Sequence, residues 1–261
     1  MSTRLELFHW EPNTYFLKPL IALAEKQAVF VSRWFDPTRL EQFAPGFPHD
    51  TASELQLERE GPLLIHGDAL ISSSFFMLEY IAEAVPGAQL LQQDAFAQYR
   101  ARAWGQFLVG LGADVSVLGC ARHLAPVLRD QPGLRARLQT VEPVERRNSW
   151  LAVLDGTYDE TVLTRTRERL RFPVGRLERT LSDSPWLAGP EYSIADIDAF
   201  ALLRSLPSLA PGVVNEQQTP GIMEFLSRMH ARKAVQQALG YSRSGSPHEA
   251  FVPGAEPSRW G

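Results

Sequence analysis

Apolar residues in the first third of the chain alternate between short extended runs and helical repeats. An apolar run over residues 4–10 ends at a Glu-Pro-Asn turn, which predicts a strand that enters a loop. The apolar positions after this turn recur at helical spacing, and Pro19 limits where that helix begins because its ring clashes with the carbonyl four residues earlier. We therefore expect a helix that starts no earlier than about Tyr15, with Asn13 and Thr14 in the loop at its mouth.

The same alternation continues to about residue 88. The pattern predicts, in order, a strand over 29–35, a short helix or turn over 36–43, an irregular loop over 44–50, strands over 63–65 and 69–71 joined by a turn at 66–68, and a helix over about 75–84 capped by the serines at 72–74. A β-α-β unit followed by a hairpin and a helix indicates an α/β domain over residues 1–88.

Helical periodicity dominates the chain beyond a linker at residues 89–93. Apolar residues keep a helical period over many turns, which is too long for a strand, so residues 94–240 are predicted to form an all-helical domain. A long arginine-rich helix is expected over 160–181, with a kink or break at Pro173.

Two further signals mark helix starts in this domain. Ser193 and Asp196 have the spacing of a capping box, and Thr219 followed by a proline is typical of the start of a helix, predicted here as the last. The stretch at 241–261 is rich in glycine, serine and proline, and we expect it to be a C-terminal tail.

Composition points to a role in handling a small molecule. The chain has 261 residues, 44% of them hydrophobic and 21% charged, which excludes a disordered or fibrous protein. A net charge of −4 gives no basic field for a polyphosphate backbone, so nucleic acid is not expected as a partner. Apolar runs stop short of the roughly 18 residues that a membrane span needs, and no secretory signal opens the chain, so no membrane association is expected.

Cysteine and histidine usage gives no indication of a metal centre. The single Cys120 excludes an internal disulfide framework and any site with several cysteine ligands, and it suits a reducing cytoplasm. The six histidines show no ligand spacing with cysteine or acidic residues, so no metal is predicted.

Motifs along the chain resemble those of the glutathione transferase superfamily. They are the helical segment 17–26, Gly61-Pro62-Leu63-Leu64, Ser73-Ser74 where the superfamily has Glu-Ser, Trp186-Leu187-Ala188-Gly189, and the capping box at 192–196. The resemblance covers nearly the whole chain. It implies a thioredoxin-like α/β domain followed by an all-α bundle, glutathione as co-substrate, and a dimer that is either homomeric or heteromeric.

A narrower likeness is to the bacterial β-aryl-etherases that cleave lignin-derived aromatic ethers. The segments that carry it are 16–20, Phe35-Asp36-Pro37 with Glu41-Gln42, and 213–215 with 219–222. This resemblance implies that a glutathione thiolate displaces a phenolate from the carbon beside a ketone. A weakly catalytic or non-catalytic subunit that binds glutathione or aromatic compounds is the alternative, because Phe16 stands where the etherases have serine and Ser73 replaces an acidic residue.

The chemistry implied by the resemblance requires donors that stabilise a thiolate. A thiol with a pKa near 8.5 needs about 2.7 kcal/mol to lower that pKa by about two units, and a helix N-terminus supplies roughly 0.3 to 1 kcal/mol. A side-chain donor is therefore expected, and Asn13 and Thr14 are the candidates, with Tyr15 also eligible. Asn13 and Thr14 are equally typical of turns and helix caps. A serine at position 16 is expected to add a hydroxyl there and to lower the thiol pKa or leave it unchanged.

The resemblance also implies the residues that hold glutathione. Gly61 and a cis Pro62 pair with the cysteinyl backbone, Ser73 and Ser74 at a helix N-terminus receive the γ-glutamyl group, and Gln42 contacts the glycyl end. An ordinary trans proline, an N-cap serine pair and a solvated glutamine are the plainer interpretations.

The second substrate is predicted to lie between the domains against flat apolar walls. Trp104, Phe107 and Leu111, on the first helix of the bundle, are the candidates. Their spacing equally fits a stripe of core residues. Trp150, Phe251 and Trp260 are considered as residues that close the pocket.

Overall fold

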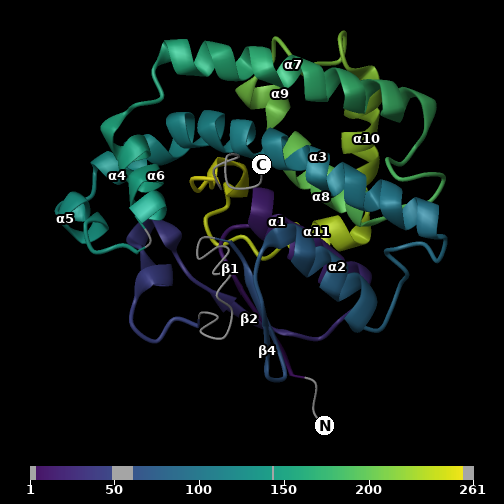
Figure 1. The fold of residues 1–261 in the computed structure, drawn as a ribbon, viewed down its shortest axis with the longest axis horizontal. Coiled ribbons are helices and arrows are strands. Elements are labelled where there is room, and N and C mark those ends of the chain that lie inside the picture. Colours follow the sequence, from purple (N-terminus) through teal and green to yellow (C-terminus); the bar gives the residue numbers. More distant parts are fainter. Residues whose placement is uncertain (1–3, 49–60, 143, 255–261) are drawn as a thin grey trace.

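The computed structural model describes residues 4–48, 61–142 and 144–254, and it separates into a sheet-containing half and a helical half (Figure 1). The sheet has the order β2-β1-β3-β4, with β1 parallel to β2, antiparallel to β3, and β3 antiparallel to β4. Its strands are β1 (Leu5–His9), β2 (Val31–Trp34), β3 (Leu63–His66) and β4 (Ala69–Ile71). The predicted strands are therefore confirmed.

Helix α1 (Thr14–Glu25) connects β1 to β2 and positions the predicted thiolate site. It begins one residue earlier than the sequence limit, so Thr14 lies inside its first turn instead of in the loop. Pro19 is accommodated within the helix, where it lies in the second turn and only one backbone hydrogen bond is lost. Asn13 is the N-cap, but its side chain makes no capping hydrogen bond.

The rest of the first domain follows the predicted order with one correction. Helices η1 (Pro37–Arg39) and η2 (Glu41–Phe43) form the expected short helical region, and α2 (Ser74–Ala84) follows β4. The predicted serine cap of α2 is wrong, because the N-cap Ser73 makes no side-chain cap hydrogen bond. Ser73 instead has a φ of 67°, which turns the chain sharply into the helix.

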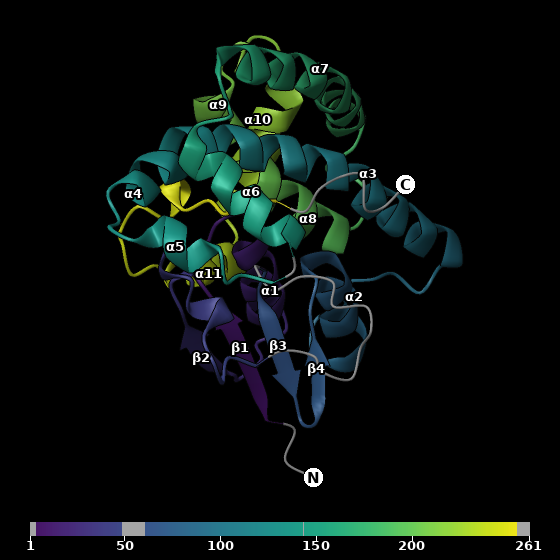
Figure 2. The same cartoon turned by 60° about the vertical axis from the view of Figure 1, so that its left-hand side comes forward.

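The second half is a bundle of helices stacked over the sheet domain (Figure 2). Its helices are α3 (Ala95–Gly119), the π-helical η3 (Cys120–Leu124), α4 (Ala125–Arg129), α5 (Leu134–Leu138), α6 (Val144–Asp155), α7 (Glu160–Asp183), α8 (Ile194–Leu203), α9 (Leu206–Leu209), α10 (Pro220–His230), α11 (Lys233–Leu239) and the short η4 (Pro247–Glu249). Helix α7 continues through Pro173 without a break. The helix that begins at Pro220 is not the last, because α11 follows it.

Helix α8 forms the centre of the molecule, since all ten of its residues are buried. It packs against α1 and α2 of the first domain and against α3 of the bundle. The predicted capping box at its start is confirmed: Ser193 Oγ accepts from the Ala195 N–H at 3.3 Å, and Asp196 Oδ2 accepts from the Ser193 N–H at 2.9 Å.

One helical run has the length and apolar composition of a membrane span. It extends over Ala95–Arg129, and half of its most apolar window is buried inside the molecule. Because α3 within this run packs against α7 and α8, that buried half is explained by the core of the bundle.

Candidate active site at the domain boundary

The side chain of Asn13 links three parts of the chain at the mouth of α1. It is fully buried, its Nδ2 donates to the Ala250 carbonyl at 3.0 Å, and its Oδ1 accepts from Arg204 at 3.2 Å and Ser205 at 3.4 Å. The amide is thus held in one orientation by α8, α9 and the C-terminal segment. One N–H of its Nδ2 remains as a donor beyond the bond to Ala250.

Arg204 brings a positive charge to the same helix end. Besides Asn13, it donates to the Pro12 carbonyl at 3.2 Å, and burial lowers its pKa from 12.5 to about 10. Within the described part of the chain, no carboxylate forms an ion pair with it. The guanidinium therefore adds to the positive end of the α1 dipole, an arrangement that favours an anion nearby.

Backbone strain coincides with the predicted site. Four non-glycine residues among those described have a positive φ, and two of them are Thr14, at 40°, and Ser73, at 67°. A β-branched residue such as threonine rarely adopts this conformation, and strain of this kind gathers at functional sites. Thr14 is also almost fully buried.

Phe16 belongs to the core and not to the mouth of the helix. Its side chain is 1% exposed and lies edge-on to the rings of Trp10 and Phe35, with centroids 6.2 and 5.8 Å away. The expectation that a serine at this position presents a hydroxyl to the thiolate is therefore wrong in this structure, because the side chain points into an aromatic cluster.

The predicted serine pair borders a cavity of about 380 Å³ between α1, α2, α3 and α8. Its apolar walls come mainly from phenylalanine, leucine and valine side chains. Two charged side chains lie deep in it: Lys18 Nζ is 2.5 Å from Asp198 Oδ1 and donates to Ser74 Oγ at 3.3 Å. We call this space the serine cavity.

A glycine on α3 allows the serine cavity to form. A Cβ at Gly105 would lie 2.1 Å from the ring of Phe75, so any larger residue there would push α2 and α3 apart. Tyr15 lines the same cavity, and its hydroxyl is 3.2 Å from Ser116 Oγ.

The remaining glutathione-binding candidates lie along the edge of the sheet domain. Pro62 is buried and Gly61 partly buried directly before β3. Gln42, on η2, is 3% exposed, and neither its Nε2 nor its Oε1 has a hydrogen-bond partner among the residues that the structure describes. Because a buried amide without partners is costly, Gln42 is a candidate for a polar ligand contact and not a solvated surface residue.

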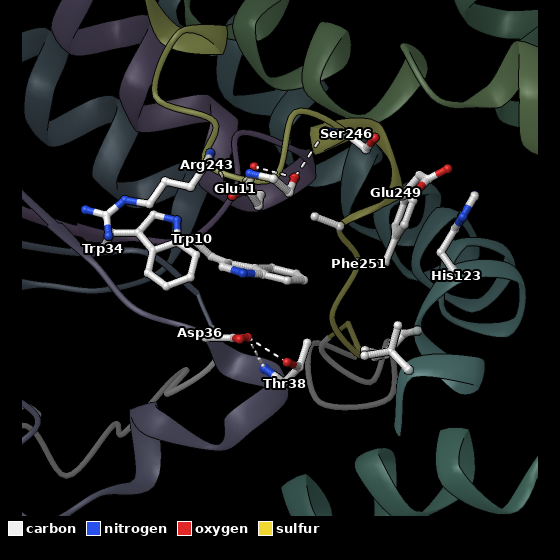
Figure 3. A pocket seen from close by; sticks show the side chains of 14 residues that line it. Trp10, Glu11, Trp34, Asp36, Thr38, His123, Arg243, Ser246, Glu249 and Phe251 are labelled. Atoms are coloured by element: carbon white, nitrogen blue, oxygen red, sulfur yellow. Dashed lines mark hydrogen bonds between the residues drawn. The ribbon is translucent and has the colours of Figure 1, made fainter. Parts of the chain in front are cut away.

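A second cavity, of about 350 Å³, lies between the first domain and the C-terminal segment (Figure 3). Trp10, Asp36 and Thr38 of the first domain face Phe251 and His123 across it. We call it the aromatic cavity. Its lining includes Trp10 and Glu11, which precede Asn13, whereas the lining of the serine cavity includes Tyr15 and Lys18, which follow Thr14.

The polar groups of the aromatic cavity are already ordered. Asp36 Oδ1 accepts from the N–H and the hydroxyl of Thr38 at 2.9 and 2.7 Å. The His123 ring stacks on Phe251 with centroids 5.7 Å apart, and burial lowers the pKa of His123, which favours a neutral imidazole at pH 7. This cavity suits a flat, uncharged ring.

The C-terminal segment is ordered and closes over this region. The buried Glu11 carboxylate accepts from Ser242 Oγ at 2.6 Å, from the Arg243 N–H at 2.9 Å, and from the N–H and hydroxyl of Ser244, both at 3.0 Å. Phe251 is buried against α3, where a Cβ at Gly119 would meet its ring at 2.1 Å. Trp260 lies outside the described residues.

The structure does not bring the predicted aromatic residues of α3 to either cavity. Trp104 donates from Nε1 to the Leu187 carbonyl at 2.9 Å, its ring lies edge-on to Phe107, and both rings lie under Arg176 of α7. Leu111 is 1% exposed in the core. The side of α3 that lines the serine cavity carries Gly105, Gln106, Leu108, Val109 and Gly112 instead. Trp150 is also a core residue.

Sequence reasoning missed Lys18, Asp198 and Arg204. A usable signal was present: Lys18 interrupts an otherwise apolar helix, and Asp198 lies in the nearly apolar stretch Ile194–Leu203. Isolated charges on buried helix faces indicate either paired ions or a ligand site. Among the described residues, no cluster of three potential metal-ligating side chains occurs.

Comparison with known proteins finds similarity to glutathione transferases. Residues 125–233 match the glutathione S-transferase C-terminal domain. The chain is 28% identical to protein LigF of Sphingobium sp. strain SYK-6, covering 92% of this chain and 94% of LigF. Glutathione S-transferase U13 of Arabidopsis thaliana is 27% identical, covering 69% of this chain and 67% of the relative.

Solved structures give the same result for the fold. The crystal structure of β-etherase LigF from that Sphingobium strain is similar with a TM-score of 0.81 and 26% identity, covering 91% of this chain and 99% of LigF. A glutathione transferase family member from Pseudomonas fluorescens, solved with two glutathione molecules, is similar with a TM-score of 0.66 and 22% identity, covering 91% of this chain and 92% of that one. With its thioredoxin-like sheet domain and helical second domain, this chain therefore has the glutathione transferase fold.

Proposed function

We propose that this enzyme uses glutathione to cleave a β-aryl ether in lignin-derived aromatic ketones. The observation that carries the proposal is the similarity to a β-etherase over nearly the full length of both chains. Two cavities of suitable size support it, one lined by residues that precede Asn13 in the chain and one by residues that follow Thr14, because the reaction needs a tripeptide and an aromatic ketone to meet at one sulfur.

In this proposal, glutathione lies along the edge of the sheet domain. The buried amide of Gln42 receives the glycyl end, the backbone at Gly61 and Pro62 pairs with the cysteinyl residue, and Ser73 and Ser74 bind the γ-glutamyl end. The N-terminus of α2 directs free N–H groups toward this last position. The tripeptide thiol then lies near the mouth of α1.

The mouth of α1 supplies three contributions to a thiolate. The helix dipole gives roughly 0.3 to 1 kcal/mol, and a hydrogen bond to a charged sulfur from Asn13 or Thr14 adds roughly 1.5 to 3 kcal/mol. The charge of Arg204, held behind Asn13, acts in the same direction. Together these contributions match the about 2.7 kcal/mol that lowers a thiol pKa by about two units.

The aromatic cavity receives the ether in this proposal. The thiolate sulfur forms a bond to the carbon beside the ketone, the C–O bond breaks, and the phenolate leaves with the electron pair and takes a proton from water. A glutathione thioether and a phenol are the products. Positioning between Trp10 and Phe251 and thiolate stabilisation are the contributions asked of the protein.

The direct test is turnover of a β-aryl ether ketone with glutathione, followed by release of the phenol. Phenol and thioether formed in equal amounts, only when glutathione is present, is the expected result. Glutathione binding without phenol release would favour the alternative, a binding subunit.

Removal of the Ser74 hydroxyl should weaken glutathione binding. Ser74→Ala removes one hydrogen bond to the charged γ-glutamyl end, which is worth on the order of 1.5 to 3 kcal/mol. Isothermal titration calorimetry measures this loss, and Ser72→Ala, two residues earlier and outside the cavity lining, is the matched control. Unchanged affinity in Ser74→Ala would remove this serine from the site.

Loss of both donors at the helix mouth should raise the pKa of the bound thiol. The double variant Asn13→Ala, Thr14→Ala leaves only the helix dipole and Arg204, and the expected rise is about one to two units, roughly 1.4 to 2.7 kcal/mol. Ultraviolet absorbance of the thiolate against pH measures it. Since Asn13 also holds the C-terminal segment, Thr14→Ala alone separates the donor effect from the loss of structure.

We also propose that the protein is a dimer, homomeric or heteromeric. Large apolar side chains are exposed on α2 and α3, with Phe76 52%, Phe96 65% and Tyr99 63% exposed. Exposed aromatic groups on neighbouring helices are typical of a subunit interface. Sedimentation equilibrium of the purified chain should give twice the chain mass for a homodimer, and the chain mass alone unless a second protein is added for a heterodimer.

A further inference from the structure

The buried ion pair between Lys18 and Asp198 does not have the properties of a stabilising structural pair. Both side chains are at most 5% exposed, and the pair joins α1 of the first domain to α8 of the second. The desolvation of two buried charges is repaid only when further hydrogen bonds satisfy them. Among the described residues, Asp198 has no partner except Lys18, and Lys18 has in addition the Ser74 hydroxyl and the ring of Tyr15, whose centroid is 5.1 Å from Nζ.

The pair also borders open space. Lys18, Asp198 and Ser74 all line the serine cavity, so a ligand there meets an ammonium group, a carboxylate and a hydroxyl side by side. The other charges that line this cavity are Glu79 and Arg102, which bind each other at 2.6 Å, and Arg102 is 45% exposed. Glu79 and Arg102 neutralise one another, so Lys18 and Asp198 are the charged groups that can bind a ligand in this cavity.

A ligand complementary to this arrangement carries both charges on one carbon. An α-amino acid end has an ammonium and a carboxylate a few ångströms apart, and it can form opposite pairs with Asp198 and Lys18. A simple anion would leave Asp198 repelling it, and a simple cation would meet Lys18. The chemistry therefore favours a zwitterion over either single charge.

We propose that Lys18 and Asp198 form a charge clamp for the α-amino and α-carboxylate groups of the γ-glutamyl end of the co-substrate. This inference rests on the proposed use of glutathione, and it adds two binding residues to the serine pair. The superfamily pattern has an acidic residue where this chain has Ser73. In this proposal, Asp198 supplies the missing negative charge. The clamp comes from the helical domain, so binding by it also holds the two domains together.

The test compares glutathione with two analogues that each lack one charge, one without the α-amino group and one without the α-carboxylate. In the wild-type protein each loss should weaken binding about 10- to 150-fold, as expected for a charge-assisted hydrogen bond. Asp198→Asn should reduce the discrimination against the deaminated analogue, and Lys18→Met the discrimination against the decarboxylated one. Calorimetry of all three ligands with each variant gives the result.

A double variant separates recognition from folding. In Lys18→Met, Asp198→Leu, apolar side chains replace the ion pair, which for buried pairs is often neutral or stabilising. Its melting temperature should be at least that of the wild type, while glutathione binds at least tenfold more weakly. The matched control is Glu25→Gln, which breaks the ion pair of α1 with Arg232 at 2.7 Å, outside the cavity, and should leave glutathione affinity unchanged.

The outcomes separate this inference from the proposed function. A wild-type protein that does not bind glutathione overturns both. Wild-type affinity for glutathione in the folded double variant, or unaltered discrimination between the analogues in both single variants, overturns the charge clamp and leaves the etherase proposal standing. A double variant that is destabilised yet binds glutathione normally assigns the pair to structure alone.

Discussion

Phe16→Ser is expected to lower the free energy of unfolding by about 3 to 5 kcal/mol or more. Loss of a buried phenylalanine ring leaves a cavity, and substitutions of this size cost about 3 to 5 kcal/mol in protein cores. The ring is 1% exposed and lies edge-on to Trp10 and Phe35, so a serine here places a hydroxyl beside these rings in the core, where burial of a polar group is costly. Urea unfolding of the two proteins measures the difference.

The same variant distinguishes between two roles of Phe16, as a replacement for a catalytic serine or as a core residue. If Phe16 had simply replaced a catalytic serine at the helix mouth, Phe16→Ser would retain its stability and lower the thiol pKa of bound glutathione. The packing predicts the opposite: stability falls and the thiol pKa stays where it was. Phe16→Leu is the control, because it keeps an apolar side chain in the cluster and should lose much less stability.

The order of the elements could be predicted from the sequence because each has a local signal. The turn residues after Trp10 and around Gly67 end strands, and the capping box at Ser193 starts a helix through bonds between residues two and three apart. Such signals depend on neighbours in the chain. The extent of the bundle was predicted less well, since α11 follows a helix that the pattern marked as the last.

The site was predictable only where it depends on chain neighbours. Ser73 and Ser74 lie at the start of α2 beside a cavity, as their place before the helix suggested. The partners of Asn13, by contrast, are more than 190 residues away in the chain, and no spacing rule reveals them.

Helical spacing also leaves open which neighbour a side chain meets. Trp104 and Phe107 repeat at the correct interval for a buried stripe, but that stripe faces α7, whereas the cavity is bordered by glycines and smaller residues of the same helix. A pattern of apolar residues identifies a covered face of a helix, and the covering element follows only from tertiary packing. The aromatic character of a stripe is therefore weak evidence for an aromatic ligand.

The second large effect is expected at Asp196, at the start of α8. Its carboxylate is completely buried and accepts from the Leu187 N–H at 2.9 Å and from the N–H and hydroxyl of Ser193 at 2.9 and 3.3 Å. Asp196→Ala leaves two backbone N–H groups buried without an acceptor, and the loss should be about 3 to 5 kcal/mol of unfolding free energy. Equilibrium unfolding in urea measures it.

The contribution of Asp196 should also depend on pH. Burial raises the pKa of Asp196 to about 7 against the effect of its three donors, whereas in the unfolded chain the value is about 3.9. At a pH between these two pKa values, Asp196 is protonated in the folded state more often than in the unfolded chain. Its contribution to stability is therefore complete below about pH 4 and is lost as the pH rises through about 7. A pKa difference of three units corresponds to on the order of 4 kcal/mol of unfolding free energy.

The variant Asp196→Asn tests this pH dependence, because its amide does not titrate. Subtracting the unfolding free energy of the variant from that of the wild type removes the contributions of all other groups. This difference should shrink from pH 5 to pH 8. A difference that stays constant over this range would mean that the three donors keep the carboxylate charged throughout, and that its pKa lies well below 7.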